Sequence, residues 1–182
     1  MNPVQTASER INRETFLALM WALSYPGRWQ MLPVVEGALE TVSAALMDSE
    51  VSFYAGDAAT AQIAAATGAR LRSIDAADFV LFDGLRPDRV HEIAAMRVGD
   101  LEYPDDGATL IVQCDAEEPE AILRLSGPGI NGVIELRVNG VPGDFWDVRA
   151  STIRFPLGID VFLIRCGQVL GLPRTTKVDV CM

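Results

Sequence analysis

The chain has 182 residues, of which 49% are hydrophobic and 22% are charged. This length suffices for one domain with a sizeable core, and the composition is too apolar for intrinsic disorder. The formal net charge is −10, and a charge of that sign repels nucleic-acid phosphates and anionic lipid surfaces. We therefore expect a single domain over residues 1–182 that binds neither nucleic acid nor a membrane.

Two scarce residue types exclude several mechanisms. The sequence has one histidine, His91, and one lysine, Lys177. The three cysteines, Cys114, Cys166 and Cys181, stand far apart, whereas zinc sites and iron-sulfur clusters need several ligands at close spacing. A Schiff-base enzyme would have only Lys177 as its nucleophile. We expect no metal site and no cofactor, and we assign no catalytic residue.

The N-terminus contains no apolar signal segment, and no stretch of the chain reaches the roughly 18 apolar residues of a spanning helix. Three cysteines without a regular spacing are typical of reduced thiols. These features favour a cytoplasmic protein.

Apolar residues at helical spacing and at strand spacing alternate along the chain. Thr6 and Glu9 form a capping-box pattern. Four apolar residues follow at helical spacing, which predicts a helix over 8–23 with these residues on its apolar face: Phe16, Leu19, Met20 and Leu23. Further helices are expected over 36–47, 58–67, 88–97 and 144–150, and strands over 51–55, 78–82, 108–114, 121–126, 159–165 and 168–172.

Helices that alternate with strands are typical of a sheet that is covered on both faces. We therefore expect an α/β fold, a single three-layer domain with a mixed sheet.

The C-terminal segment has the pattern of a buried hairpin. Cys166 and Gly167 offer a two-residue turn between apolar runs. A turn centred there pairs Arg165 with Gln168 and places segment 155–158 beside segment 173–177. The same register would set Gly158 opposite Thr175.

This end of the chain also differs in charge. Residues 151–182 contain four basic and two acidic side chains, whereas residues 1–150 contain eleven basic and twenty-three acidic ones. Arginine and threonine donors at a strand end suit phosphate or phosphonate oxygens, and loops at the carboxyl ends of strands often carry ligands. A solvated loop that balances an acidic surface remains the alternative. The predicted anion cleft consists of Phe155, Pro156, Gly158, Asp160, Arg174, Thr175 and Thr176.

The segment 127–132 matches the letters of a dinucleotide-binding loop, G-x-G-x-x-G. Such a loop must open a helix, but residues 133–138 have strand character and Pro128 removes a backbone donor. We therefore interpret the segment as a turn between strands.

Four segments in a fixed order carry a family resemblance: FLALMWALSYPG at 16–27, GATLI at 107–111, LRLSGPGI at 123–130, and FPLGID at 155–160, which continues to LPRTTKV at 172–178. The sequence resembles the H-subunit family of the bacterial carbon-phosphorus lyase complex.

The resemblance implies a fold similar to the large domain of pyridoxal phosphate (PLP)-dependent aminotransferases, without a PLP site. It also implies a homodimer that joins other subunits of a core complex. That complex couples ATP to an alkylphosphonate and forms a ribose triphosphate alkylphosphonate. We therefore expect an accessory, non-catalytic subunit.

Two alternatives stay open. The chain could be a stand-alone enzyme or binding protein for a phosphorylated small molecule, with Asp160 as base and Arg174 as anion clamp. It could also bind PLP through Lys177.

Overall fold

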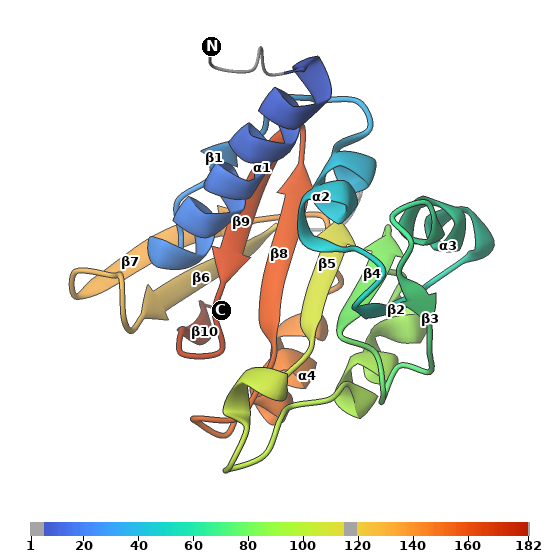
Figure 1. Cartoon of the computed structure of the whole chain (residues 1–182). Helices are drawn as coiled ribbons and strands as arrows, with labels where there is room; N and C mark the ends of the chain where they lie inside the picture. The colour runs from blue at the N-terminus through green and yellow to red at the C-terminus, as the bar shows by residue number, and fades with distance from the viewer. Residues whose placement is uncertain (1–5, 115–119, 182) are drawn as a thin grey trace.

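The computed structural model describes residues 6–114 and 120–181, and it contains two sheets (Figure 1). The helices are α1 (Ala7–Ser24), α2 (Ala38–Leu46), α3 (Ala58–Ala65) and α4 (Phe145–Thr152), with two 3₁₀ helices, η1 (Pro87–Ala95) and η2 (Pro104–Asp106). The strands are β1 (Gln30–Met31), β2 (Ser52–Ala55), β3 (Arg70–Leu71), β4 (Phe79–Asp83), β5 (Thr109–Gln113), β6 (Ala121–Ser126), β7 (Val133–Val138), β8 (Asp160–Arg165), β9 (Gln168–Leu172) and β10 (Lys177–Cys181).

The larger sheet has seven strands in the order β1-β9-β8-β5-β4-β2-β3. Strands β3, β2, β4, β5 and β8 run parallel to one another, and β9 is antiparallel to both β8 and β1. The expected α/β fold with a mixed sheet is therefore confirmed.

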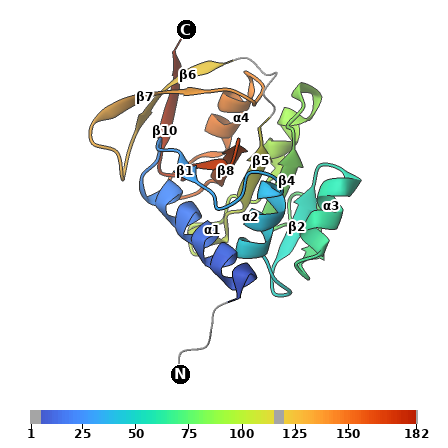
Figure 2. The same cartoon turned by 90° about the horizontal axis from the view of Figure 1, so that it is seen from above.

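Both faces of this sheet are covered (Figure 2). On one face α1, α2 and α3 bury Leu19, Val42 and Ala64 against apolar strand residues such as Phe162. On the other face η1, α4 and the smaller sheet pack around strand residues such as Leu163. The central strands carry apolar side chains on both faces of the sheet, so both faces must be shielded from water.

The strand predicted at 121–126 exists, but it lies in a second, three-stranded antiparallel sheet in the order β10-β6-β7. Residues 177–181, for which no element was expected, form strand β10. Along β6 the buried Leu123 and Leu125 alternate with the exposed Arg124. That alternation suits a sheet with one solvated face, in contrast to the central strands.

The apolar face predicted for the first helix was right in part. Leu19 is buried and Leu23 packs against the core, but Phe16 and Met20 are exposed. The other buried residues of α1 are Thr15, Ala18 and Ala22. Small residues bring α1 close to β9, where a Cβ on Gly171 would lie 2.5 Å from the carbonyl carbon of Ala22.

The helix expected over 88–97 is the 3₁₀ helix η1 and ends at Ala95. Met96 is already extended, with φ −62° and ψ 148°. Val98 then pairs with Gly107, which takes the chain away from helical geometry.

The predicted hairpin is confirmed, with Arg165 opposite Gln168. The ladder ends at the pair Val161 and Leu172, so it does not extend to the expected pair of Gly158 and Thr175. The segment 127–132 is the turn between antiparallel β6 and β7, as predicted. In the part of the chain that the structure describes, no helix combines the length and the apolarity needed to cross a bilayer.

Candidate functional site

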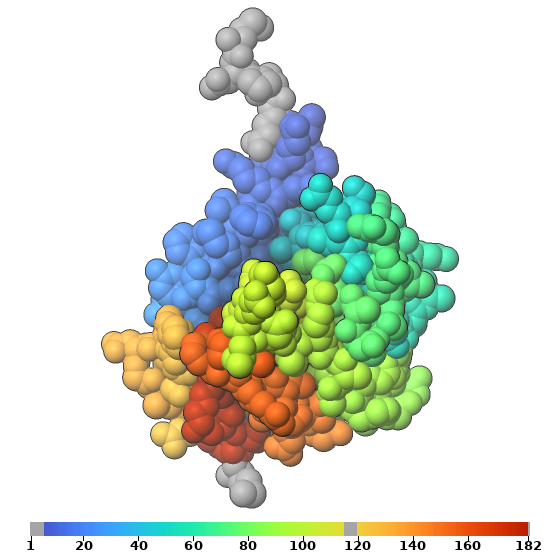
Figure 3. All heavy atoms as spheres, turned by 60° about the horizontal axis from the view of Figure 1, so that its bottom comes forward, coloured from blue at the N-terminus to red at the C-terminus, as the bar shows by residue number. Residues whose placement is uncertain are grey.

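The predicted cleft residues lie together around two adjoining pockets, which we call the cleft. Figure 3 shows this side of the molecule, where the segments near residues 104, 155 and 174 meet at the surface. One pocket of about 410 Å³ is lined by Pro128, Ile153, Phe155, Arg174, Thr175, Thr176 and Lys177. The other, of about 330 Å³, is lined by Pro104, Asp105, Phe155, Pro156, Asp160, Pro173, Arg174 and Thr175.

The cleft lies at the amino edge of the parallel strands. Strand β9 is antiparallel to β8, so the residues that follow Leu172 lie beside Asp160, where β8 begins. The loop that carries Arg174 follows the carboxyl end of β9, as expected for a ligand-carrying loop. Because a hairpin reverses the direction of its second strand, that end of β9 lies at the amino edge of the parallel strands.

Arg174 is held by its neighbours. Its guanidinium donates to the Asp160 carboxylate at 3.2 Å and to the carbonyl of Pro104, and its backbone N–H donates to Asp160 at 2.7 Å. The Arg174 and Asp160 side chains are only 18% and 20% exposed. The positive charge that was expected to face an anion is therefore already paired with a carboxylate.

A tight turn presents the aromatic wall of the cleft. Arg154 and Leu157 exchange backbone hydrogen bonds of 3.0 and 2.9 Å, and Phe155 lies between them with 75% of its surface exposed. Gly158 lies beneath the turn with φ +149°, and a Cβ there would come within 3.2 Å of the Arg174 Cβ. Only glycine suits this backbone and this approach.

Arg149 in α4 is a part of the site that the sequence did not identify. It is 2% exposed and donates to the carbonyls of Pro173 at 2.9 Å and of Leu172 and Thr176 at 3.4 Å. Burial lowers the pKa of Arg149 to about 10. It fixes the loop between β9 and β10, and no spacing signal marks an arginine in a short helix as buried.

The other polar groups of the cleft differ in exposure and in hydrogen bonding. The Thr176 hydroxyl is buried and has no hydrogen-bond partner within the described residues. Lys177 is exposed and pairs with Asp179 at 3.0 Å. Thr175 lines both pockets. The cleft lining also contains the exposed Asp105.

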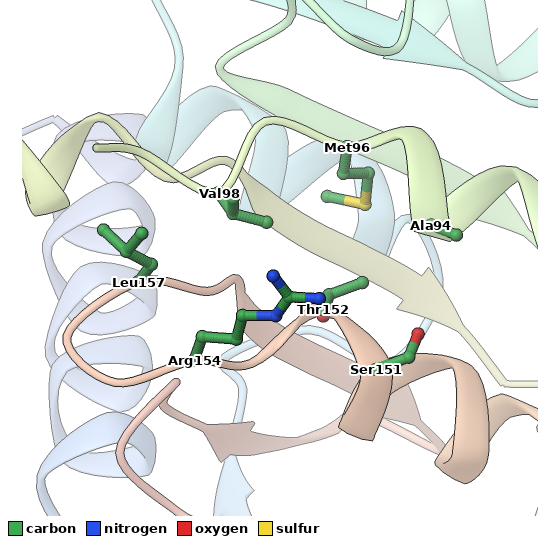
Figure 4. A pocket seen from close by; sticks show the side chains of 7 residues that line it. All are labelled: Ala94, Met96, Val98, Ser151, Thr152, Arg154 and Leu157. Atoms are coloured by element: carbon green, nitrogen blue, oxygen red, sulfur yellow. The ribbon is translucent and has the colours of Figure 1, made fainter. Parts of the chain in front are cut away.

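A smaller pocket of about 240 Å³ lies on the other side of the same turn. In Figure 4 the Arg154 side chain points into it, between Val98 and Thr152. The hydroxyls of Ser151 and Thr152 donate to the carbonyls of their own helix at 2.7 and 2.8 Å. The pocket is lined by Ala94, Met96, Val98, Ser151, Thr152, Arg154 and Leu157.

The titratable side chains that line the cleft are Asp105, Asp160, Arg174 and Lys177. Its lining includes neither histidine nor cysteine, and His91 is exposed on η1. Among residues 6–114 and 120–181, no group of three or more His, Cys, Asp or Glu side chains is placed to hold a metal ion.

Comparison with known proteins agrees with the resemblance in the sequence. A model of the family described as "Bacterial phosphonate metabolism protein (PhnH)" matches residues 5–179. The C-P lyase subunit protein HtxG of Stutzerimonas stutzeri is 37% identical over 170 residues, which are 91% of this chain and 84% of that protein. The alpha-D-ribose 1-methylphosphonate 5-triphosphate synthase subunit PhnH of Rhizobium meliloti (strain 1021) is 42% identical over 83 residues, which are 45% of this chain and 42% of that protein. The chain therefore belongs to the PhnH family of bacterial phosphonate metabolism proteins.

Proposed function

We propose that the chain is an accessory, non-catalytic subunit of a cytoplasmic carbon-phosphorus lyase complex. In that complex it supports the ATP-dependent formation of a ribose triphosphate alkylphosphonate. Two findings support the proposal: the PhnH family match over residues 5–179, and a relative named as a C-P lyase subunit that aligns with 91% of this chain.

The pairing of Asp160 with Arg174 is the observation that carries the non-catalytic role. A general base must be free to reach a substrate proton, but both Asp160 carboxylate oxygens accept hydrogen bonds from Arg174, which hold the carboxylate against the guanidinium. The same pair leaves the guanidinium without an open charge for an anion clamp. The cleft is therefore better suited to binding than to catalysis. Its ligand would be a phosphate-bearing or phosphonate-bearing molecule, or a partner chain, that contacts Phe155 and Thr175.

The outer face of α1 supports association with other chains, in a homodimer or with other lyase subunits. Phe16, Leu17, Met20, Trp21 and Tyr25 are all exposed along this helix. The Trp21 and Tyr25 rings stack with their centroids 5.5 Å apart. Contiguous exposed apolar residues of this kind mark interaction surfaces.

The proposal includes the expected likeness to the large domain of PLP-dependent aminotransferases without a PLP site. The run of parallel strands in the mixed sheet supports it. Lys177, the residue that a PLP aldehyde would need, is exposed and paired with Asp179.

Co-expression tests the subunit role. The tagged chain is produced together with the other carbon-phosphorus lyase subunits from the same genome, and the purified product is weighed by native mass spectrometry. We expect a stoichiometric complex, and the measured mass also gives the number of copies of this chain. A chain that purifies without those subunits would contradict the proposal.

Growth on a phosphonate as phosphorus source tests the cleft. Phe155→Ala should abolish growth and leave the fold intact, because the ring is exposed and lines both pockets. Leu101→Ala is the matched control, an exposed apolar residue that lines neither pocket. Equal growth of both variants would exclude the cleft from the function.

The alternative is a stand-alone enzyme or binding protein for a phosphorylated small molecule that uses the same cleft. The unpartnered Thr176 hydroxyl, buried at the pocket of about 410 Å³, is the observation in its favour. Turnover of nucleotides or ribosyl phosphonates by the purified chain alone would establish this alternative. Activity only in the assembled complex would support the accessory role.

A further inference from the structure

The carboxyl edge of the parallel strands holds a pocket that is separate from the cleft. In Figure 1 the arrowheads of β5 and β8 point to this edge, and Figure 2 looks onto it. Open α/β sheets bind ligands outside the carboxyl ends of their strands. The pocket has a volume of about 250 Å³ and is lined by Trp29, Arg137, Arg165, Cys166 and Gln168.

Arg165, the last residue of β8, brings a positive charge that no carboxylate among the described residues pairs with. Its guanidinium donates to the side-chain oxygen of Asn139, which is a neutral amide. Within the described residues, no carboxylate lies within 4.0 Å of it. Its Nε is buried and has no hydrogen-bond partner there. Arg165 therefore keeps both a charge and donors for another group.

Arg137 brings a second guanidinium to the same pocket from β7 in the smaller sheet. It pairs with Glu120 at 2.9 Å, and both side chains are exposed. An exposed pair of this kind contributes little stability, so a ligand can take one of the Arg137 donors at small cost. Two planar guanidinium groups that face one pocket match the oxygens of a carboxylate, phosphate or phosphonate.

Trp29 supplies an apolar wall. The indole is half-buried against the core on the same side of the larger sheet as the smaller sheet. Gln168 lies opposite Met31 in the neighbouring strand, with Nε2 at 3.3 Å from the Met31 sulfur. The volume is below the range of about 300–1,000 Å³ that holds drug-sized ligands, which limits the occupant to a small molecule.

We propose that this pocket binds a small organic oxyanion, with a carboxylate or phosphorus oxyanion head against Arg165 and Arg137 and a short apolar body against Trp29. The site goes beyond the proposed subunit role, because all the residues that line it belong to this chain and it does not require another subunit. It also differs from the cleft, in which the arginine is paired with a carboxylate.

Calorimetric titration of the purified full-length chain tests the proposal. The probes are phenylphosphonate, benzoate, inorganic phosphate and the neutral benzyl alcohol. We expect at least one of the two aromatic anions to bind at least about tenfold more tightly than phosphate or the alcohol. Only an anion with a ring can contact both the two arginines and the Trp29 indole. The preferred head group identifies the class of oxyanion. Equal affinity for phosphate and both aromatic anions, or no heat with either aromatic anion, would overturn the proposal.

Variants locate the site. Arg165→Gln should weaken the binding of the preferred probe at least about tenfold, since a charge-assisted hydrogen bond is lost. Arg124→Gln is the control, an exposed arginine of β6 that lines none of these pockets. Arg137→Gln, at an exposed position, is the second test variant and should also weaken binding; it replaces Arg165→Gln if that protein does not fold. Unchanged affinity in folded Arg165→Gln and Arg137→Gln proteins would overturn the assignment.

Two further measurements separate this pocket from other sites. Probe binding should change the tryptophan fluorescence of the wild-type chain, and Trp29→Phe should remove that change, because Trp21 and Trp146 do not line the pocket. Phe155→Ala should bind the probe as the wild type does; loss of binding in that variant would place the ligand in the cleft. None of these results depends on complex assembly, so the failure of this proposal and the failure of the subunit role remain distinguishable.

Discussion

Asp160 and Arg174 join the beginning of β8 to the end of β9 at the amino edge of the larger sheet. The Asp160 carboxylate accepts the backbone N–H of Arg174 at 2.7 Å and its guanidinium at 3.2 Å. The β8–β9 ladder has already ended at Val161 and Leu172. The two side-chain contacts therefore continue the connection between the strands where backbone pairing stops.

Asp160→Ala should lower the free energy of unfolding by about 2 kcal/mol, because hydrogen bonds to a charged group contribute about 1.5–3 kcal/mol each when protected from solvent. Urea unfolding measures the change. Asp179→Ala is the control, since its pair with Lys177 is 56% and 71% exposed and should contribute less than about 1 kcal/mol. Similar losses in the two variants would mean that the Asp160 contacts do not stabilise the fold.

Gly171→Ala should destabilise the protein by more than about 1 kcal/mol. A Cβ at Gly171 would lie 2.5 Å from the carbonyl carbon of Ala22 and 2.7 Å from the backbone nitrogen of Leu23, and overpacking of this kind forces the backbone to move. The midpoint of thermal unfolding reports the effect. Gly143→Ala meets nothing within 4 Å and should leave the midpoint unchanged or slightly raised. A silent Gly171→Ala would show that α1 is not held against β9.

Cys114 should be the least reactive of the three thiols. Burial raises its pKa to about 12 from 9.0, so the reactive thiolate is scarce near neutral pH. Ellman's reagent at neutral pH should label Cys166 and Cys181 in the native protein and Cys114 only after unfolding. Labelling of Cys114 at the rate of Cys166, which is exposed, would contradict its burial.

The same thiol makes stability depend on alkaline pH. Its folded pKa is above the unfolded value, so its contribution is fully present below pH 9.0 and falls as the pH rises toward about 12. The slope is at most about 1.4 kcal/mol per pH unit. Cys114→Ala should remove this component of the unfolding free energy, measured in urea across that range.

Asp57 caps α3 and links the stability of that helix to acid. Its carboxylate accepts hydrogen bonds from the Thr60 hydroxyl at 2.6 Å and from the N–H groups of Ala59 and Thr60 at 2.8 and 3.0 Å. The Thr60 hydroxyl is the main cause of the lowered pKa of Asp57. Asp57→Ala should cost about 1 kcal/mol at neutral pH.

The sign of the pH effect follows from that lowered pKa. The contribution of Asp57 is present above the unfolded value of 3.8 and is lost as the pH falls through the lower folded value. Asp57→Asn keeps a capping oxygen and should lose only this acid dependence. Urea unfolding near neutral pH and in acid compares the three proteins, and an identical acid response in Asp57→Asn and wild type would show that Asp57 does not titrate with folding.

Local patterns in the sequence predicted most elements of the fold correctly. The capping box of Thr6 and Glu9 forms as expected, because it depends on residues within one helical turn. The register of the C-terminal hairpin follows from its two-residue turn alone. The predicted cleft residues meet because that hairpin brings the segments near 155 and 174 together.

Packing against distant segments decided what these patterns could not. Periodicity indicated that α1 is amphipathic but assigned Phe16 and Met20 to the wrong face, since the close approach of β9 at Gly171 selects the small residues of the helix. Alternation predicted β6 as a strand, but its membership of a second sheet depends on pairing with β7 and β10.

The charges show the same division most clearly. The sequence by itself determined that arginines gather near the C-terminal hairpin in an otherwise acidic chain. Only the tertiary structure decided which of them are paired: Arg174 faces Asp160, Arg149 is enclosed by backbone carbonyls, and Arg165 is left without a carboxylate among the described residues. The physical reason is that a guanidinium is neutralised by groups within a few ångströms in space, and that distance is set by the order and direction of strands.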